Sequence, residues 1–193
     1  MKLLHLFGAT ALISAALLAN PYETKNEELI SVIKTGKEAS DALLKTLGGS
    51  LKKHLKSEGP MGAVKFCSTN AYPLTDSINT ELGENVSIKR ISLKYRNPAN
   101  KPTENEANVL TSLETLKNSG VMLPPYMLEQ VDKETYKFYR PLTINKGVCL
   151  KCHGTMSDTP KLAKFINKNY PEDKAFGYKM GDLRGAIVVT VKK

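Results

Sequence analysis

The chain has 193 residues and a formal net charge of +9, with three cysteines, three histidines and no tryptophan. This length suits one domain with a core of ordinary size, and no internal repeat or low-complexity stretch divides it. Nucleic acid is the first partner that a basic chain suggests. Here, however, lysines supply nearly all of the positive charge and are interleaved with Glu and Asp, and aromatic-basic clusters are sparse. We therefore expect no nucleic-acid partner.

Residues 1–19 are predicted to be a signal peptide. A lysine at the second position precedes a run that is almost wholly apolar, Asn20 breaks this run, and Ala19 offers a small residue for cleavage. The alternative is an uncleaved membrane anchor, but the run is at the short limit for spanning a bilayer and lacks a basic stop after it. We expect cleavage, export to the periplasm, and a mature domain of residues 20–193 that meets the membrane only if the signal stays uncleaved.

Helices dominate the first part of the predicted domain. Apolar residues recur at helical spacing over residues 22–56, which predicts one long amphipathic helix, or two that are broken at Gly48 and Gly49. Pro60 can start the next helix, and Pro73 should kink or end it.

The second half is richer in strands. Alternation over residues 86–96 slips in phase, which predicts a strand with a bulge near Lys89 and Arg90. A capping box at residues 103–106 opens a helix that Gly120 closes. The remaining predicted elements are strands at 126–131, 135–142 and 185–191 and a short helix at 161–169. The fold class is therefore α+β, an antiparallel sheet with a long N-terminal helix and helical insertions.

The most informative motif is Cys-x-x-Cys-His, formed by Cys149, Cys152 and His153. Two thiols spaced three residues apart can add to the two vinyl groups of a porphyrin, and the adjacent imidazole can then bind the iron as an axial ligand. A thioredoxin-like redox site would give the histidine no role. A zinc site could use the same three side chains, but no second pair at conventional spacing supplies a fourth ligand. The motif predicts one covalently attached haem c.

The second axial ligand of the iron decides the chemistry. Met156 is tethered to the same face of the porphyrin as His153, and His54 lies among lysines on a predicted helix surface. Cys67 is the third cysteine, on a helical stripe of small apolar residues, where a buried free thiol is also common. The other candidates that the residues leave open are Met61, Met122, Met127 and Met180.

Several separated stretches resemble a known family: residues 62–67 (GAVKFC), 94–102 (KYRNPANKP), 139–142 (YRPL), 149–154 (CLKCHG) and 181–189 (GDLRGAIVV). They resemble the single c-type haem domain family with a PAS-like fold, found as stand-alone periplasmic haem proteins and as sensor domains of histidine kinases. The resemblance covers roughly residues 25–193. One departure is Asn105, where this family often has an aromatic residue.

The resemblance implies a PAS-like antiparallel sheet around one haem with mixed His/Cys ligation. His153 would be the proximal ligand and Cys67 the distal one, and residues 96–100 would shape the pocket wall. Arg96 or Arg140 could hold a haem propionate, because a guanidinium binds a carboxylate through two hydrogen bonds. Each of these arginines could instead form a surface ion pair.

A six-coordinate iron leaves no vacant position for a substrate, so we expect no enzymatic activity. The first hypothesis is a low-potential periplasmic electron carrier, because a thiolate ligand stabilises ferric iron. Its lysines could steer an acidic redox partner, although solubility explains the same charge. The second hypothesis is a redox or gas (NO/CO) sensor that acts through a separate partner. A zinc-binding structural domain is the third.

Overall fold

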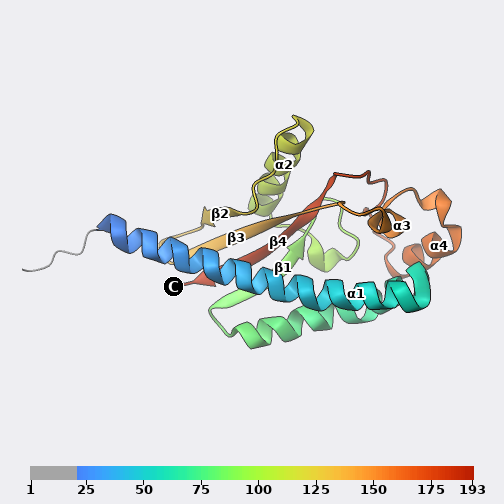
Figure 1. Cartoon of the computed structure of the whole chain (residues 1–193), viewed down its shortest axis with the longest axis horizontal. Helices are drawn as coiled ribbons and strands as arrows, with labels where there is room; N and C mark the ends of the chain where they lie inside the picture. The colour runs from blue at the N-terminus through green and yellow to red at the C-terminus, as the bar shows by residue number, and fades with distance from the viewer. Residues whose placement is uncertain (1–20) are drawn as a thin grey trace, which may run out of the picture.

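The computed structural model describes residues 21–193, and their side chains from residue 25. The predicted signal peptide therefore lies outside the described residues. Four strands and the helices around them follow one another along the chain (Figure 1). Their bounds are α1 Pro21–Leu82, β1 Val86–Ile91, η1 Pro98–Asn100, α2 Glu104–Asn118, β2 Met127–Gln130, β3 Thr135–Thr143, η2 Gly147–Cys149, α3 Leu150–His153, η3 Met156–Asp158, α4 Pro160–Asn169 and β4 Leu183–Lys192. Within this part of the chain, no helix is both long enough and apolar enough to cross a bilayer.

Helix α1 is two helical arms joined at a sharp bend (Figure 1). The bend is at Gly59, whose φ of 69° is in the left-handed region that glycine adopts without steric cost. Pro60 begins the second arm, as predicted, because its missing N–H is unneeded in a first helical turn. Of the two alternatives predicted for residues 22–56, one long helix is confirmed, because the first arm runs through Gly48 and Gly49 without a break. Pro73 does not end the second arm, which continues to residue 82.

The four strands form one antiparallel sheet in the order β1-β4-β3-β2, so the predicted α+β class is confirmed. Strand β4 lies between β1 and β3 and pairs with both. The predicted bulge near Lys89 and Arg90 was wrong, because β1 pairs with β4 in an unbroken register from Val86 to Ile91. The phase slip has another cause. Ile88 packs with α1 and Ile91 packs with α2, so both faces of this strand bury an apolar residue.

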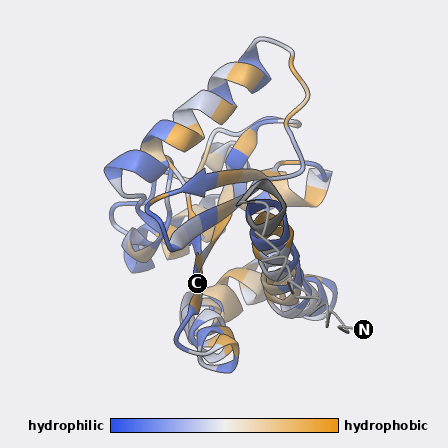
Figure 2. Ribbon diagram, turned by 90° about the vertical axis from the view of Figure 1, so that its left-hand side faces the viewer, coloured by the Kyte–Doolittle hydropathy of each residue, from blue (hydrophilic) through white to orange (hydrophobic). Residues whose placement is uncertain are grey.

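The sheet lies between α1 on one face and α2 on the other (Figures 1 and 2). The core on the α1 side is built mainly from Val32, Leu43, Tyr136, Phe138 and Val189. The core on the α2 side is built mainly from Leu110, Leu113, Tyr139, Ala186 and Val188. The Cys-x-x-Cys-His motif lies in η2 and α3, at the end of the sheet where α4 also lies (Figure 1).

A buried carboxylate ties α2 to the sheet. Thr103 and Glu106 form the predicted capping box at the start of α2, and the Glu106 side chain is almost fully buried. Lys89 Nζ donates to its Oε2 at 2.8 Å, and Lys137 Nζ donates to its Oε1 at 3.0 Å. Burial raises the pKa of Glu106, but the hydrogen bonds from Lys89, the Thr103 backbone and Lys137 outweigh burial and hold the pKa below its usual range.

The first prediction concerns the close approach of α1 to the sheet at Gly36. A Cβ atom added at Gly36 would lie 2.3 Å from Phe138 Cγ in β3. We expect Gly36→Ala to lower the free energy of unfolding by about 1–3 kcal/mol, as overpacking of a core does. In the matched control Gly49→Ala, the added Cβ meets no atom within 4 Å. This change should raise stability by about 0.5–1 kcal/mol, because alanine favours the helix. Denaturant titration measures both, and equal stabilities would contradict the prediction.

The second prediction concerns Glu106. Because its pKa is lowered in the folded state, the stability it contributes is present above its unfolded pKa, about 4.3, and is lost as pH falls through the folded value. We expect Glu106→Gln to cost about 2 kcal/mol at pH 7, because two lysines lose their carboxylate partner. The cost should shrink below pH 4. Glu104→Gln, an exposed neighbour in the same helical turn, is the control and should change stability by less than about 1 kcal/mol. A cost that does not depend on pH would refute the charge-based account.

Candidate functional site

The two thiols of the motif lie one helical turn apart at the start of α3. Cys149 ends η2 and Cys152 lies within α3, so residues at this spacing share one face of the turn. Both thiols are half-buried and free of disulfides. Gly154 ends the turn, where an added Cβ would lie 2.5 Å from the Leu150 carbonyl oxygen. The sequence therefore folds locally into a compact turn that presents two thiols and an imidazole together.

The ring of His153 is held in one orientation. Its Nδ1 lies 2.8 Å from the backbone carbonyl oxygen of Ala175. A carbonyl oxygen can only accept, so Nδ1 carries the proton and donates it, which leaves Nε2 with a free lone pair. Burial first, and then the nearby Arg184 and Arg96, lower the pKa of His153 to about 3. The imidazole is neutral at physiological pH, as a metal ligand must be.

The segment between α4 and β4 is hydrogen-bonded along the motif. Gly177 N donates to the carbonyl of Gly154 at 2.9 Å, and Tyr178 N donates to the carbonyl of His153 at 2.9 Å. The Tyr178 ring meets the His153 ring edge-on, with 6.0 Å between centroids. The orientation of His153 therefore depends on a segment more than twenty residues away in the sequence.

Arg96 fastens this segment to the motif. Its Nε donates to Asp173 Oδ2 at 3.1 Å, and the Asp173 side chain is only 1% exposed. Its Nη2 donates to the carbonyl of Cys152 at 2.7 Å and to that of Ala175 at 3.2 Å. The sequence offered Arg96 as a residue that could hold a haem propionate. The structure places it at the motif, where its Nε and Nη2 donate to groups of the protein chain itself.

Arg140 lies elsewhere. It is in β3 and its Nη1 donates to Ser40 Oγ at 3.1 Å and to the carboxylate of Asp41, both in the first arm of α1. The structure therefore brings Cys149, Cys152, His153 and Arg96 together and leaves Arg140 in an ion pair between α1 and β3.

Cys67 lies in the second arm of α1, near the motif. Val64, one turn earlier on the same arm, packs in a cluster with Cys152, Leu162 and Ile166. Burial raises the pKa of the Cys67 thiol, while the positive charges of Arg90 and Arg96 oppose this rise. Cys67 also contributes to a raised pKa at Cys152, which burial dominates. The bend at Gly59 is what returns α1 to the motif and places this third thiol near it.

The other candidate axial ligands have different surroundings. His54 Nδ1 lies 2.6 Å from Glu58 Oε1, and its ring stacks on Phe66 at 4.2 Å between centroids. Met122 and Met180 are 92% and 53% exposed. The remaining three methionines are partly buried: Met127 in the core beneath α2, and Met61 and Met156 in the cluster that contains Cys152.

The sequence reasoning missed two arginines. Arg90 in β1 lies near Cys67 and Tyr170. Arg184, the second residue of β4, donates from Nη1 to Ser92 Oγ at 2.6 Å and to the Lys94 carbonyl at 3.2 Å. Its guanidinium lies 5.4 Å from the Tyr178 ring centroid. Arg184 falls in the 181–189 stretch that carried the family resemblance, so the resemblance held a signal for it, whereas nothing in the local sequence distinguished Arg90.

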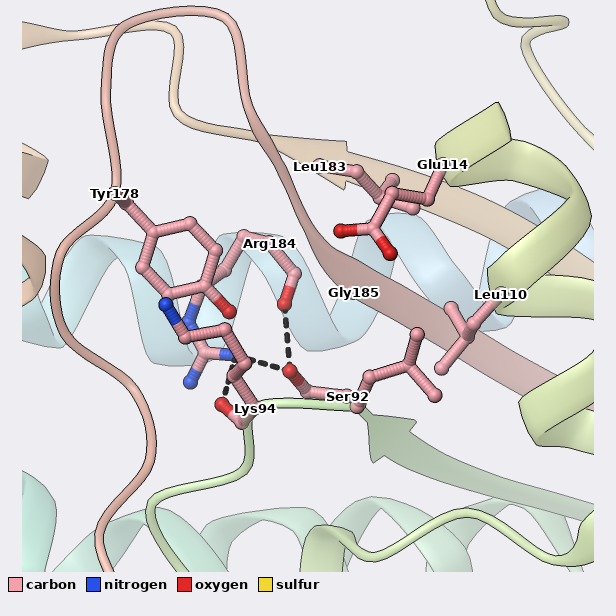
Figure 3. A pocket seen from close by; sticks show the side chains of 9 residues that line it. Ser92, Lys94, Leu110, Glu114, Tyr178, Leu183, Arg184 and Gly185 are labelled. Carbon is pink, nitrogen blue, oxygen red and sulfur yellow. Dashed lines mark hydrogen bonds between the residues drawn. The ribbon is translucent and has the colours of Figure 1, made fainter. Parts of the chain in front are cut away.

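A shallow cleft lies beside Tyr178 and Arg184 (Figure 3). Leu110 and Glu114 of α2 and Leu183 of β4 form its far wall. Its enclosed volume is only about 10 Å³, far below the roughly 300 Å³ at which pockets begin to bury organic ligands. Across residues 25–193, moreover, no group of three or more His, Cys, Asp or Glu side chains is arranged to hold a metal ion. The zinc hypothesis therefore has no ligand set in the described part of the chain.

Two comparisons relate the chain to known proteins. A family model described as Tll0287-like matches residues 16–192. The crystal structure of the cyanobacterial haem protein Tll0287 is similar, with 26% sequence identity and a TM-score of 0.58, over 91% of this chain and 98% of that one. No curated protein matches. Because the family model spans nearly the whole chain, the protein belongs to the Tll0287-like family.

Proposed function

We propose that the protein binds one haem c, attached through thioethers to Cys149 and Cys152, with His153 as the proximal ligand of the iron. The observation that carries this proposal is the state of His153, whose Nδ1 proton is donated to Ala175 and whose Nε2 is left free. The similar cyanobacterial protein is itself a haem protein. The two free thiols on one helical turn beside a neutral imidazole fit the donor set that a covalently attached haem requires.

Cys67 is the distal ligand in this proposal, and the fold around it is PAS-like. Support for Cys67 comes from the second arm of α1, which returns this thiol to the vicinity of Cys152. Met61 is the nearest competitor by packing, because it contacts the same cluster as Cys152. A thiolate is the stronger donor to ferric iron than a thioether, so sulfur from Cys67 would lower the reduction potential.

We further propose that the protein is a periplasmic carrier of single electrons. A bound haem c would supply a one-electron couple, and the chain would fix its surroundings. The His153–Ala175 hydrogen bond would keep the imidazole oriented, and the Arg96–Asp173 pair would hold the segment that carries Ala175. Two protein ligands leave no vacant coordination position, which favours electron transfer over catalysis. Residues 1–19 would direct export, and an acidic redox partner would meet the lysine-rich surface.

The third prediction concerns attachment. We expect the exported protein to be red, and its haem to stay on the chain after denaturation, because thioethers survive unfolding. The double variant Cys149→Ser/Cys152→Ser should lose covalent haem completely, whereas Cys67→Ser is the matched control and should keep it. Absorbance and intact mass of the denatured protein measure this. A colourless preparation that contains zinc would overturn the proposal.

The fourth prediction concerns Cys67 as the distal ligand of the iron. We expect Cys67→Ala to change the ferric absorbance spectrum and to raise the reduction potential by on the order of 100 mV, because the thiolate no longer stabilises ferric iron. Met61→Leu is the control for the competing sulfur and should change neither. A Cys67→Ala variant that matches the parent in both would show that the distal ligand lies elsewhere.

Carbon monoxide added to the reduced parent tests the second function. An unchanged spectrum supports a closed electron-transfer site. Formation of a CO adduct would instead mean that Cys67 leaves the iron on reduction, which is the behaviour of the sensor alternative. Potentiometric titration with and without CO measures both properties in one sample.

A further inference from the structure

Three of the four arginines of the chain gather around the proposed haem site. Arg96 Nη2 donates to the carbonyl of Cys152 at 2.7 Å. The Arg184 guanidinium lies 5.4 Å from the centroid of the Tyr178 ring, which meets the His153 ring edge-on. Arg90 lies near Cys67. Arg90 and Arg96 also lie near Arg184. They therefore form one cluster of half-buried positive charge.

One carboxylate serves this cluster. Asp173 forms an ion pair with Arg96 at 3.1 Å. The Nη2 of Arg96 donates to the backbone carbonyls of Cys152 and Ala175. Among the described residues, no carboxylate forms an ion pair with Arg90 or Arg184. Three guanidiniums against one carboxylate leave two positive charges uncompensated. Charges removed from water are normally paired, because desolvation of an unpaired charge is unfavourable.

Arg90 is the clearer of the two unpaired arginines. It shares the α1 side of β1 with Ile88, since alternate residues of a strand point to the same face. Its Nε is the single buried side-chain nitrogen or oxygen without a hydrogen-bond partner that the described residues contain. An unsatisfied buried donor of this kind calls for an acceptor that is not part of the chain.

Arg184 is half-buried, like Arg90, and its hydrogen-bond partners are neutral. Its Nη1 donates to Ser92 Oγ and to the Lys94 carbonyl, and its guanidinium faces the ring of Tyr178 (Figure 3). These contacts fix the position of the guanidinium without compensating its charge. Ser92 Oγ in turn donates to the Arg184 carbonyl, so the arginine is held at both its backbone and its side chain. These contacts hold the positive charge of the Arg184 guanidinium in one position.

We propose that Arg90 and Arg184 bind the two propionate carboxylates of the haem, one each. The inference rests on the proposed haem attachment and assigns the anionic part of the cofactor to residues that the sequence did not identify. Two carboxylates supply the two negative charges that the cluster lacks. A guanidinium suits each of them, because its parallel N–H groups match both oxygens of a carboxylate. Arg96 is thereby left to its role in bracing the segment around Ala175.

The experiment compares Arg90→Gln, Arg184→Gln and Arg140→Gln in the haem-loaded protein by resonance Raman spectroscopy. Arg140 is the matched control, because its Nη1 is engaged with Ser40 and Asp41 on the opposite helix arm. We expect one propionate-bending band to shift in Arg90→Gln and the other to shift in Arg184→Gln. Both bands should keep their parent positions in Arg140→Gln. Loss of a nearby positive charge should also lower the reduction potential in the first two variants.

Further outcomes separate this inference from the proposed function. A parent protein without covalent haem would refute the haem attachment itself. A parent with haem whose propionate bands do not move in either variant would overturn the arginine assignment alone. A shift of the iron–sulfur stretching band with unmoved propionate bands would mean that Arg90 acts on Cys67, which also overturns it. If a glutamine variant does not accumulate, Arg90→Lys and Arg184→Lys keep the charge and should each give a smaller shift of the same band.

Discussion

The hydrogen bond from His153 Nδ1 to the Ala175 carbonyl is the constraint on which the proposed site depends. The bond sets the tautomer of the imidazole, and it joins a four-residue helix to a segment that has no regular secondary structure. The segment is held because Arg96 donates to Asp173 and to the Ala175 carbonyl within it, and also to the carbonyl of Cys152 in the motif. The motif and its support are therefore one hydrogen-bonded unit, and a change in any of these contacts reaches the imidazole.

The sheet and the bend in α1 place the remaining groups around that unit. The first arm of α1 covers one face of the sheet and approaches it closely at Gly36, while α2 covers the other face and is tied to it by Glu106. The bend at Gly59 then reverses the chain, so that the second arm carries Cys67 toward α3. A straight α1 would have taken Cys67 away from the sheet. The glycine at the bend is thus as important to the proposed distal ligand as the cysteine itself.

Local signals in the sequence predicted most elements of the fold, because each depended on residues close together in the chain. The capping box at Thr103 and Glu106 and the apolar pattern of β4 are examples, and both are confirmed. The bulge in β1 was predicted wrongly because alternation alone cannot show that both faces of a strand are covered. The sequence left open whether the helix breaks at Gly48 and Gly49, because glycine permits a break and tertiary packing decides where one occurs.

The candidate site also contains residues that the sequence identifies and residues that only the fold identifies. The spacing of Cys149, Cys152 and His153 identifies them in the sequence, and Arg96 falls in the 94–102 stretch that carries the family resemblance. Ala175 acts through its backbone carbonyl, so no side chain marks it in the sequence. Nothing in the local sequence distinguishes Arg90. Only the fold shows that it lies near Cys67 and that its Nε has no hydrogen-bond partner.

Charge balance links the two proposals. A thiolate on ferric iron cancels the charge that the porphyrin dianion leaves on the metal, so the centre of an oxidised His/Cys haem is neutral, and its two propionates are the only net charge. The arginine cluster with Asp173 carries two positive charges to meet them. Were those charges left free, they would favour the added electron and raise the potential, against the effect of sulfur. Paired with propionates, they act on the iron only weakly, and the thiolate then sets the potential. A low-potential carrier therefore needs both Cys67 on the iron and the propionates on the arginines.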